Sequence, residues 1–111
     1  MKTQEYLNQN PIVKNFINKV NSEITTYYEQ QLSNLEPKLV TASIGTKFIK
    51  LEQSGCVWGF ISRFDGFHKG MPVRKGDLLK PADWRTPAKH SRGNITDGTA
   101  SYTVYGPSYL V

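Results

Sequence analysis

Apolar residues recur at helical spacing through the first third of the chain. Between residues 10 and 36 successive apolar residues lie one, three or four positions apart, which places them on one face of an α-helix for about six turns. Asn10 suits the N-cap position and Pro11 the first helical position, and Pro37 ends the segment. A short helical turn is expected before it, over residues 3–8. The apolar stripe consists of Val13, Phe16, Ile17, Val20, Ile24, Tyr27, Tyr28, Leu32 and Leu35.

Beyond Pro37 the pattern changes to that of β-strands. Residues 38–43, 46–53, 56–64, 77–80 and 101–105 are expected to be strands, because β-branched and aromatic residues are frequent there and polar residues alternate with them. In residues 56–64 alternation places Trp58 and Phe60 on one face and Val57 and Ile61 on the other. Residues 67–75 look like an inserted, glycine-punctuated loop.

This order of elements predicts an α+β fold. A helix followed by a meander of strands favours an N-terminal amphipathic helix packed on a small antiparallel β-sheet. We expect one domain over residues 1–111, with the helix at 10–36 and the sheet with a basic loop at 38–111. A helix this long, with one apolar stripe, could also pair with a second copy of itself, so a homo-oligomer is a further expectation.

The stretch 76–95 interrupts the meander with prolines, a tryptophan and many cations. Pro81 and Pro87 each lack a backbone donor and bias the preceding residue toward extended geometry, so no helix is expected through both. We interpret residues 81–95 as a loop. Trp84 has two readings: it packs on the sheet and anchors the loop, or it stacks on a base or enters a partner's pocket.

The chain carries a net charge of +5, and this charge is unevenly placed. Eleven of the fourteen Lys and Arg residues lie between residues 38 and 92, with only four acidic residues among them. Such an excess favours a polyanion or an acidic protein surface as partner. Hydrophobic residues make up 38% of the chain, and the longest apolar run, 56–61, is far too short to span a bilayer. No membrane partner is expected.

No catalytic or metal-binding signature stands out. His90, beside Lys89 and Arg92, could act as a general acid or base in a metal-free nuclease, with His68 as the only other histidine. We treat this as a minor alternative and expect no enzyme activity, no cofactor and no metal site. Asp77 and Asp83 are expected to form local ion pairs, rather than to bind Mg²⁺.

The single cysteine, Cys56, excludes an internal disulfide and fits a reducing, cytoplasmic setting. We expect it to be a buried, inert thiol at the start of a strand. The residues expected to contact nucleic acid or another partner are Lys80, Trp84, Arg85, Lys89, His90, Arg92 and Asn94.

The second half of the chain resembles a group of small uncharacterised tailed-bacteriophage proteins. The resemblance covers residues 56–111 and depends on the string GDLLKPADWRTPAKHSRGNI at 76–95, above all on Gly76, Asp77, Lys80, Trp84, Pro87, Ala88, Lys89, His90, Arg92, Gly93 and Asn94. It implies a phage origin and a location in the host cytoplasm, or in the virion, and it implies no mechanism.

Two functions remain open from the sequence. The first is a non-enzymatic phage accessory protein that binds nucleic acid through a basic sheet and loop surface. The alternative is a protein-interaction module, either a virion component or an inhibitor of an acidic host protein.

Overall fold

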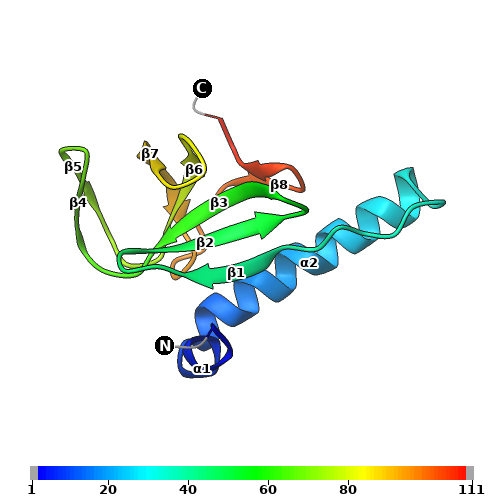
Figure 1. Ribbon diagram of the computed structural model, residues 1–111, viewed down its shortest axis with the longest axis horizontal. Helices are drawn as coiled ribbons and strands as arrows, with labels where there is room; N and C mark the ends of the chain where they lie inside the picture. Colours follow the sequence, from blue (N-terminus) through cyan, green and yellow to red (C-terminus); the bar gives the residue numbers. More distant parts are fainter. Residues whose placement is uncertain (1–2, 110–111) are drawn as a thin grey trace.

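The structure, a computed structural model, describes residues 3–109 and has two helices followed by nine short strands (Figure 1). The predicted α+β class is confirmed. The elements are α1 (Thr3–Gln9), α2 (Pro11–Gln31), β1 (Thr41–Ile44), β2 (Phe48–Gln53), β3 (Cys56–Ser62), β4 (Gly66–His68), β5 (Met71–Val73), β6 (Asp77–Pro81), β7 (Pro87–Asn94), β8 (Tyr102–Thr103) and β9 (Gly106–Pro107).

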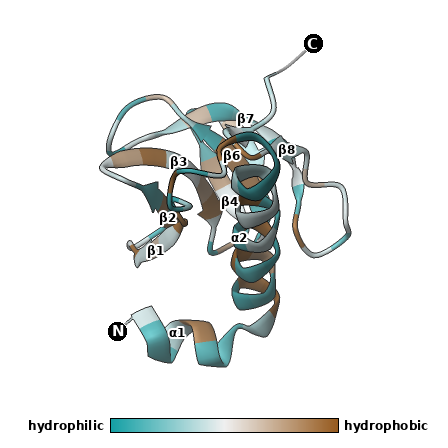
Figure 2. Cartoon of the chain, turned by 90° about the vertical axis from the view of Figure 1, so that its right-hand side faces the viewer, coloured by the Kyte–Doolittle hydropathy of each residue, from teal (hydrophilic) through white to brown (hydrophobic). Residues whose placement is uncertain are grey.

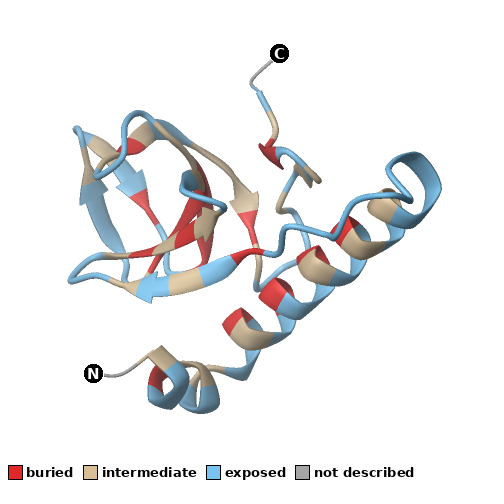
Figure 3. Ribbon diagram, turned by 45° about the vertical axis from the view of Figure 1, so that its right-hand side comes forward, coloured by how far each residue is buried: buried red, intermediate tan, exposed pale blue. Residues whose placement is uncertain are grey.

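The main sheet has five antiparallel strands in the order β1-β2-β3-β6-β7, and α2 covers one of its faces. The pairs β4–β5 and β8–β9 form separate two-stranded hairpins. In Figure 3 the buried side of α2 faces the sheet, while its last turn and the segment after it are exposed.

Helix α2 begins where the sequence predicted but ends at Gln31 instead of residue 36. Its last buried residue is Ile24, and Leu35 is 60% exposed, so the final part of the predicted stripe has nothing to pack against. Asn10 occupies the N-cap position without a side-chain capping bond. Its amide donates instead to the Tyr6 carbonyl at 2.8 Å, which joins α2 to α1.

The core lies between α2 and the sheet. In Figure 2 hydrophilic residues cover much of the outward surface of α2, whereas hydrophobic segments lie in the strands behind it. Phe16 packs edge-on against Tyr102 and Trp58, with ring centroids 5.3 and 6.4 Å away. The part of the stripe from Val13 to Ile24 is buried within the chain, so this part could pair with a second copy only by leaving the sheet. The buried helix residues are Val13, Phe16, Ile17, Val20 and Ile24.

A β-bulge in β3 overturns one part of the predicted alternation. Leu51 pairs with Gly59 but the next residue, Glu52, pairs with Val57, so β3 carries one extra residue at this point. The bulge turns Trp58 toward α2, on the same side as Ile61, whereas Phe60 faces the opposite side. The prediction that Trp58 and Phe60 share a face is therefore wrong.

Three segments differ from their sequence interpretation. Residues 67–75 are not an irregular loop, because β4 and β5 form a hairpin whose turn has positive φ at Lys69 and Gly70. Residues 87–94 form the edge strand β7, where a loop was predicted. The strand predicted at 101–105 contains only residues 102–103, and this strand, β8, pairs with β9 outside the main sheet.

Replacing Phe16 with alanine tests the helix–sheet core. Phe16 is 8% exposed, so Phe16→Ala should lower the free energy of unfolding by about 3–5 kcal/mol, measured by urea denaturation. The matched control is Ile12→Ala on the same helix, where the side chain is 52% exposed. It should cost less than about 1 kcal/mol. Equal losses for the two variants would show that the stripe is not the core.

Candidate nucleic-acid interface

The base of the β6–β7 hairpin is held by a buried hydrogen-bond network. Asn94 is 1% exposed, and its amide nitrogen donates to the Lys75 carbonyl and to Asp77 Oδ1, both at 2.9 Å. Its amide oxygen accepts from the Thr96 backbone N–H at 2.7 Å. Asn94 therefore has no free amide atom for a partner, which corrects the prediction that it belongs to a binding surface.

Two glycines allow this network to form. Gly93 has a φ of 93°, and a Cβ there would lie 2.0 Å from the Thr99 carbonyl oxygen. Gly76 has a φ of 91° and packs against the Asn94 side chain. The Gly76-Asp77 and Gly93-Asn94 pairs, both part of the phage-like string, thus face each other across the hairpin, where Asp77 is the strand partner of Asn94.

Strand β7 is strongly bulged. Its eight residues run alongside only five residues of β6, and the register shifts on both sides of the Leu79–Ser91 pair. Extra residues in one strand bend it and redirect its side chains. In this strand Lys89 and His90 are exposed, whereas Arg92 is half-buried and bonds the C-terminal segment, so the single basic loop predicted from the sequence is divided.

Lys80 and Arg92 hold the C-terminal hairpin. Lys80 Nζ donates to the Pro107 carbonyl at 2.5 Å and lies 4.0 Å from the centre of the Tyr109 ring. Arg92 Nε donates to the Ser108 carbonyl at 2.8 Å. Burial lowers the pKa of both groups, and the Arg92 charge lowers the pKa of Lys80 further. These two predicted binding residues therefore have structural contacts of their own.

Trp84 and Arg85 lie at the tip of the hairpin. Asp83 Oδ1 accepts from the backbone N–H groups of Arg85 and Thr86, at 2.8 and 2.7 Å, and this turn is closed by the Ala82 N–H bond to the Thr86 carbonyl. Those two N–H groups lower the pKa of Asp83. The tip is thus ordered by its own hydrogen bonds, while both Trp84 and Arg85 remain exposed.

The tip lies close to strand β2 on the face of the sheet away from α2. Lys50 Nζ of β2 lies 4.1 Å from the centre of the Trp84 ring, within range of a cation–π interaction. Lys50 also lies 3.8 Å from Glu52. Trp84 is 48% exposed, so it contacts the sheet without being a core anchor, and its stacking role remains a prediction.

A cavity of about 390 Å³ lies beside this contact, between the β1–β2 turn and the hairpin tip. Phe48 and Phe60 of the sheet form its apolar part. The turn that carries Lys47 is held by Arg63, whose guanidinium donates to the Gly45 carbonyl at 2.6 Å. We call Lys47, Phe48, Lys50, Trp84 and Arg85 the cationic face.

The β4–β5 hairpin also contacts the cationic face, through His68. His68 is in hydrogen-bonding contact with the Pro87 carbonyl at 2.8 Å, and its ring packs edge-on against Phe48 at 5.1 Å. Figure 1 shows the β4–β5 and β6–β7 hairpins projecting on the same side of the sheet. His68 thus connects the two hairpins.

Lys89 and His90 lie exposed on β7. The nuclease alternative would need His90 beside a second acid or base, and His68 is engaged with Pro87 and Phe48. Within residues 3–109 no three His, Cys, Asp or Glu side chains are placed to hold a metal ion. Asp77 is buried and lies 3.7 Å from Arg74, as expected for a local ion pair.

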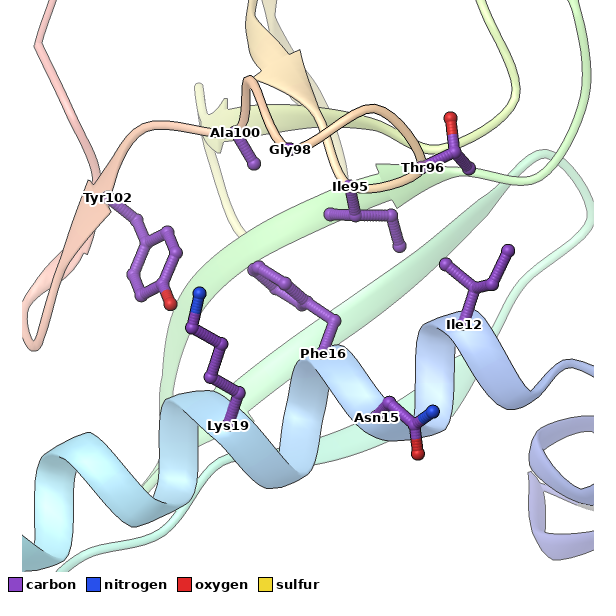
Figure 4. Close-up of a pocket in the computed structure, with 9 residues that line it drawn as sticks. All are labelled: Ile12, Asn15, Phe16, Lys19, Ile95, Thr96, Gly98, Ala100 and Tyr102. Carbon is purple, nitrogen blue, oxygen red and sulfur yellow. The ribbon is translucent and has the colours of Figure 1, made fainter.

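Two other features lie away from the cationic face. Cys56 is exposed, so the prediction of a buried thiol is wrong; β3 begins at the surface and enters the core only at Trp58. A second cavity, of about 310 Å³, lies between α2 and the loop after β7 (Figure 4). Phe16, Ile95 and Tyr102 line it, and Lys19 supplies its one cation.

Sequence reasoning missed three members of the cationic face: Lys47, Phe48 and Lys50. The alternation of residues 46–53 does place Phe48 and Lys50 on the face opposite Ile49 and Leu51. That pattern shows which side of the strand they occupy. It cannot show that the tip of a distant hairpin lies over them.

Comparisons with models of protein families, with curated proteins and with solved structures found no match to this chain. Neither helix in residues 3–109 has the length and apolar character needed to cross a membrane.

Asn94→Ala should destabilise the fold because it leaves Asp77 Oδ1 and the Lys75 carbonyl without this donor in a buried site. We expect the free energy of unfolding to fall by about 1–3 kcal/mol for each unsatisfied group. His90→Ala, on the exposed part of the same strand, should change it by less than about 0.5 kcal/mol. An Asn94→Ala variant of normal stability would argue against the network.

Acid should loosen the hairpin tip. Because the pKa of Asp83 is lowered from its ordinary value of 3.8, its contribution is present above that value and is lost as the pH falls through the lowered pKa. NMR shifts of the Arg85 and Thr86 amides should titrate with a midpoint below 3.8. Asp83→Asn keeps an acceptor oxygen and should abolish this titration. A midpoint at or above the ordinary value would contradict the turn geometry.

Proposed function

We propose that the protein binds nucleic acid, without catalysing a reaction, through the cationic face. The observation that carries the proposal is the half-exposed Trp84 ring, placed over Lys50 and beside a cavity lined by Lys47, Lys50 and Arg85. Cations contact phosphates without regard to sequence, and an aromatic ring offers a surface for a base. The three cations come from β2, the turn before it and the β6–β7 tip.

The resemblance of residues 56–111 to small tailed-phage proteins supports an accessory role during infection, in the host cytoplasm or in the virion. Charge alone would also suit an acidic protein surface, which is the second candidate. The exposed aromatic ring among the cations favours nucleic acid, because bases present flat π-faces.

The test removes charge from the cationic face. Lys47→Gln with Arg85→Gln should weaken binding to all sequences alike, because both side chains are exposed and contact phosphates in the proposal. The plot of log K against log salt should become shallower by about 1.4–1.8, the value for two phosphate contacts. Fluorescence anisotropy with labelled oligonucleotides at several salt concentrations gives this slope.

The control variant removes two positive charges outside the cationic face. Lys19→Gln with Lys38→Gln alters two exposed lysines outside the cationic face and should leave the slope unchanged. Equal effects of the two double variants would mean that binding follows net charge and not this site. Wild-type binding no tighter than about 10⁻⁴ M at low salt, the weak limit for non-specific complexes, would reject nucleic acid and favour the acidic protein partner.

A further inference from the structure

The cationic face holds its one exposed tryptophan in a fixed position. Asp83 closes the tip turn through two backbone N–H groups, and Pro81 pairs with Pro87 at the end of the strands. Below the ring, Lys50 Nζ lies 4.1 Å from its centre. A side chain held in this way loses little conformational entropy when a ligand packs on it.

The exposure of the ring indicates where a ligand would bind. Lys50 Nζ lies over one face of the indole, and Trp84 is nevertheless 48% exposed, so part of its surface stays accessible to a ligand. An accessible indole with a cation against it suits an aromatic ligand that stacks flat. Lys47 and Arg85 line the neighbouring cavity together with Lys50 and add positive charge near the ring. A planar group joined to phosphates satisfies both features.

We infer that the ligand of the cationic face is single-stranded nucleic acid, with an unpaired base stacked on Trp84. The inference rests on the proposed function and goes further, because bases within a duplex are already stacked on one another and cannot offer a face to the indole without unstacking. The phosphates on either side of the base contact Lys47 and Arg85. Stacking accepts any base, so no sequence preference is expected.

Intrinsic tryptophan fluorescence tests the inference directly. Trp58 is 3% exposed, so quenching on binding reports on Trp84. The probe is an oligothymidylate of about 12 nucleotides, within the site sizes of single-strand binders. The comparison ligands are its duplex with oligodeoxyadenylate and an abasic strand of the same length. The single strand should quench Trp84 and bind more tightly than the duplex or the abasic strand.

Substitution of Trp84 separates stacking from charge. Trp84→Ala should lower affinity for the single strand by about 5- to 150-fold, the effect of losing one stacked base, and should leave the salt slope unchanged. It should not alter binding of the abasic strand. Trp84→Phe retains a ring and should recover most of the affinity. Urea midpoints of both variants show whether each remains folded, and Trp84→Phe keeps the test valid if Trp84→Ala does not.

The outcomes distinguish the inference from the proposed function. One outcome is that the duplex, the abasic strand and the single strand bind equally, that the Lys47 and Arg85 substitutions weaken all three, and that the Trp84 variants weaken none. This outcome would overturn base stacking on Trp84 and leave binding through the phosphates in place. If none of the three ligands binds, both the inference and the proposed function are overturned. Single-strand preference that disappears in Trp84→Ala and returns in Trp84→Phe supports the inference.

Discussion

Trp58, in β3 of the main sheet, joins that sheet to α2 and to the C-terminal hairpin. Its ring lies against Phe16 of α2 and Tyr102 of β8, and its indole N–H donates to the Val104 carbonyl at 3.2 Å. The β3 bulge makes this possible, because one extra residue turns Trp58 to the helix side of the sheet. A side chain that packs on a helix and bonds a distant turn fixes both relative to the sheet.

With the helix side of the sheet occupied, the opposite side is left to the two hairpins. Phe60, Leu79 and Val73 are buried there but lie outside the cluster under α2. The contact of His68 with the Pro87 carbonyl holds β4–β5 against β7. This second, smaller apolar layer supports the cationic face, so the candidate site depends on packing that no helix provides.

The positive charges have different roles according to burial. Lys80 and Arg92 donate to carbonyls of the C-terminal segment, where burial lowers the pKa of each and the bonds compensate for lost hydration. The side chains of Lys47 and Arg85 are exposed to solvent, so their charges stay hydrated and are available to a polyanion. A high count of cations in a sequence therefore overstates the number that can bind a ligand.

The sequence by itself determined the elements whose signal is local. The apolar period of α2 and the alternation of β2 follow from side-chain geometry within one segment, and the α+β class follows from their order. The tertiary structure decided the rest. Bulges in β3 and β7 change the phase of alternation through pairing with a neighbouring strand, and the meeting of Trp84 with Lys50 joins residues thirty-four positions apart. Such contacts depend on how strands pair and twist, which no single segment encodes.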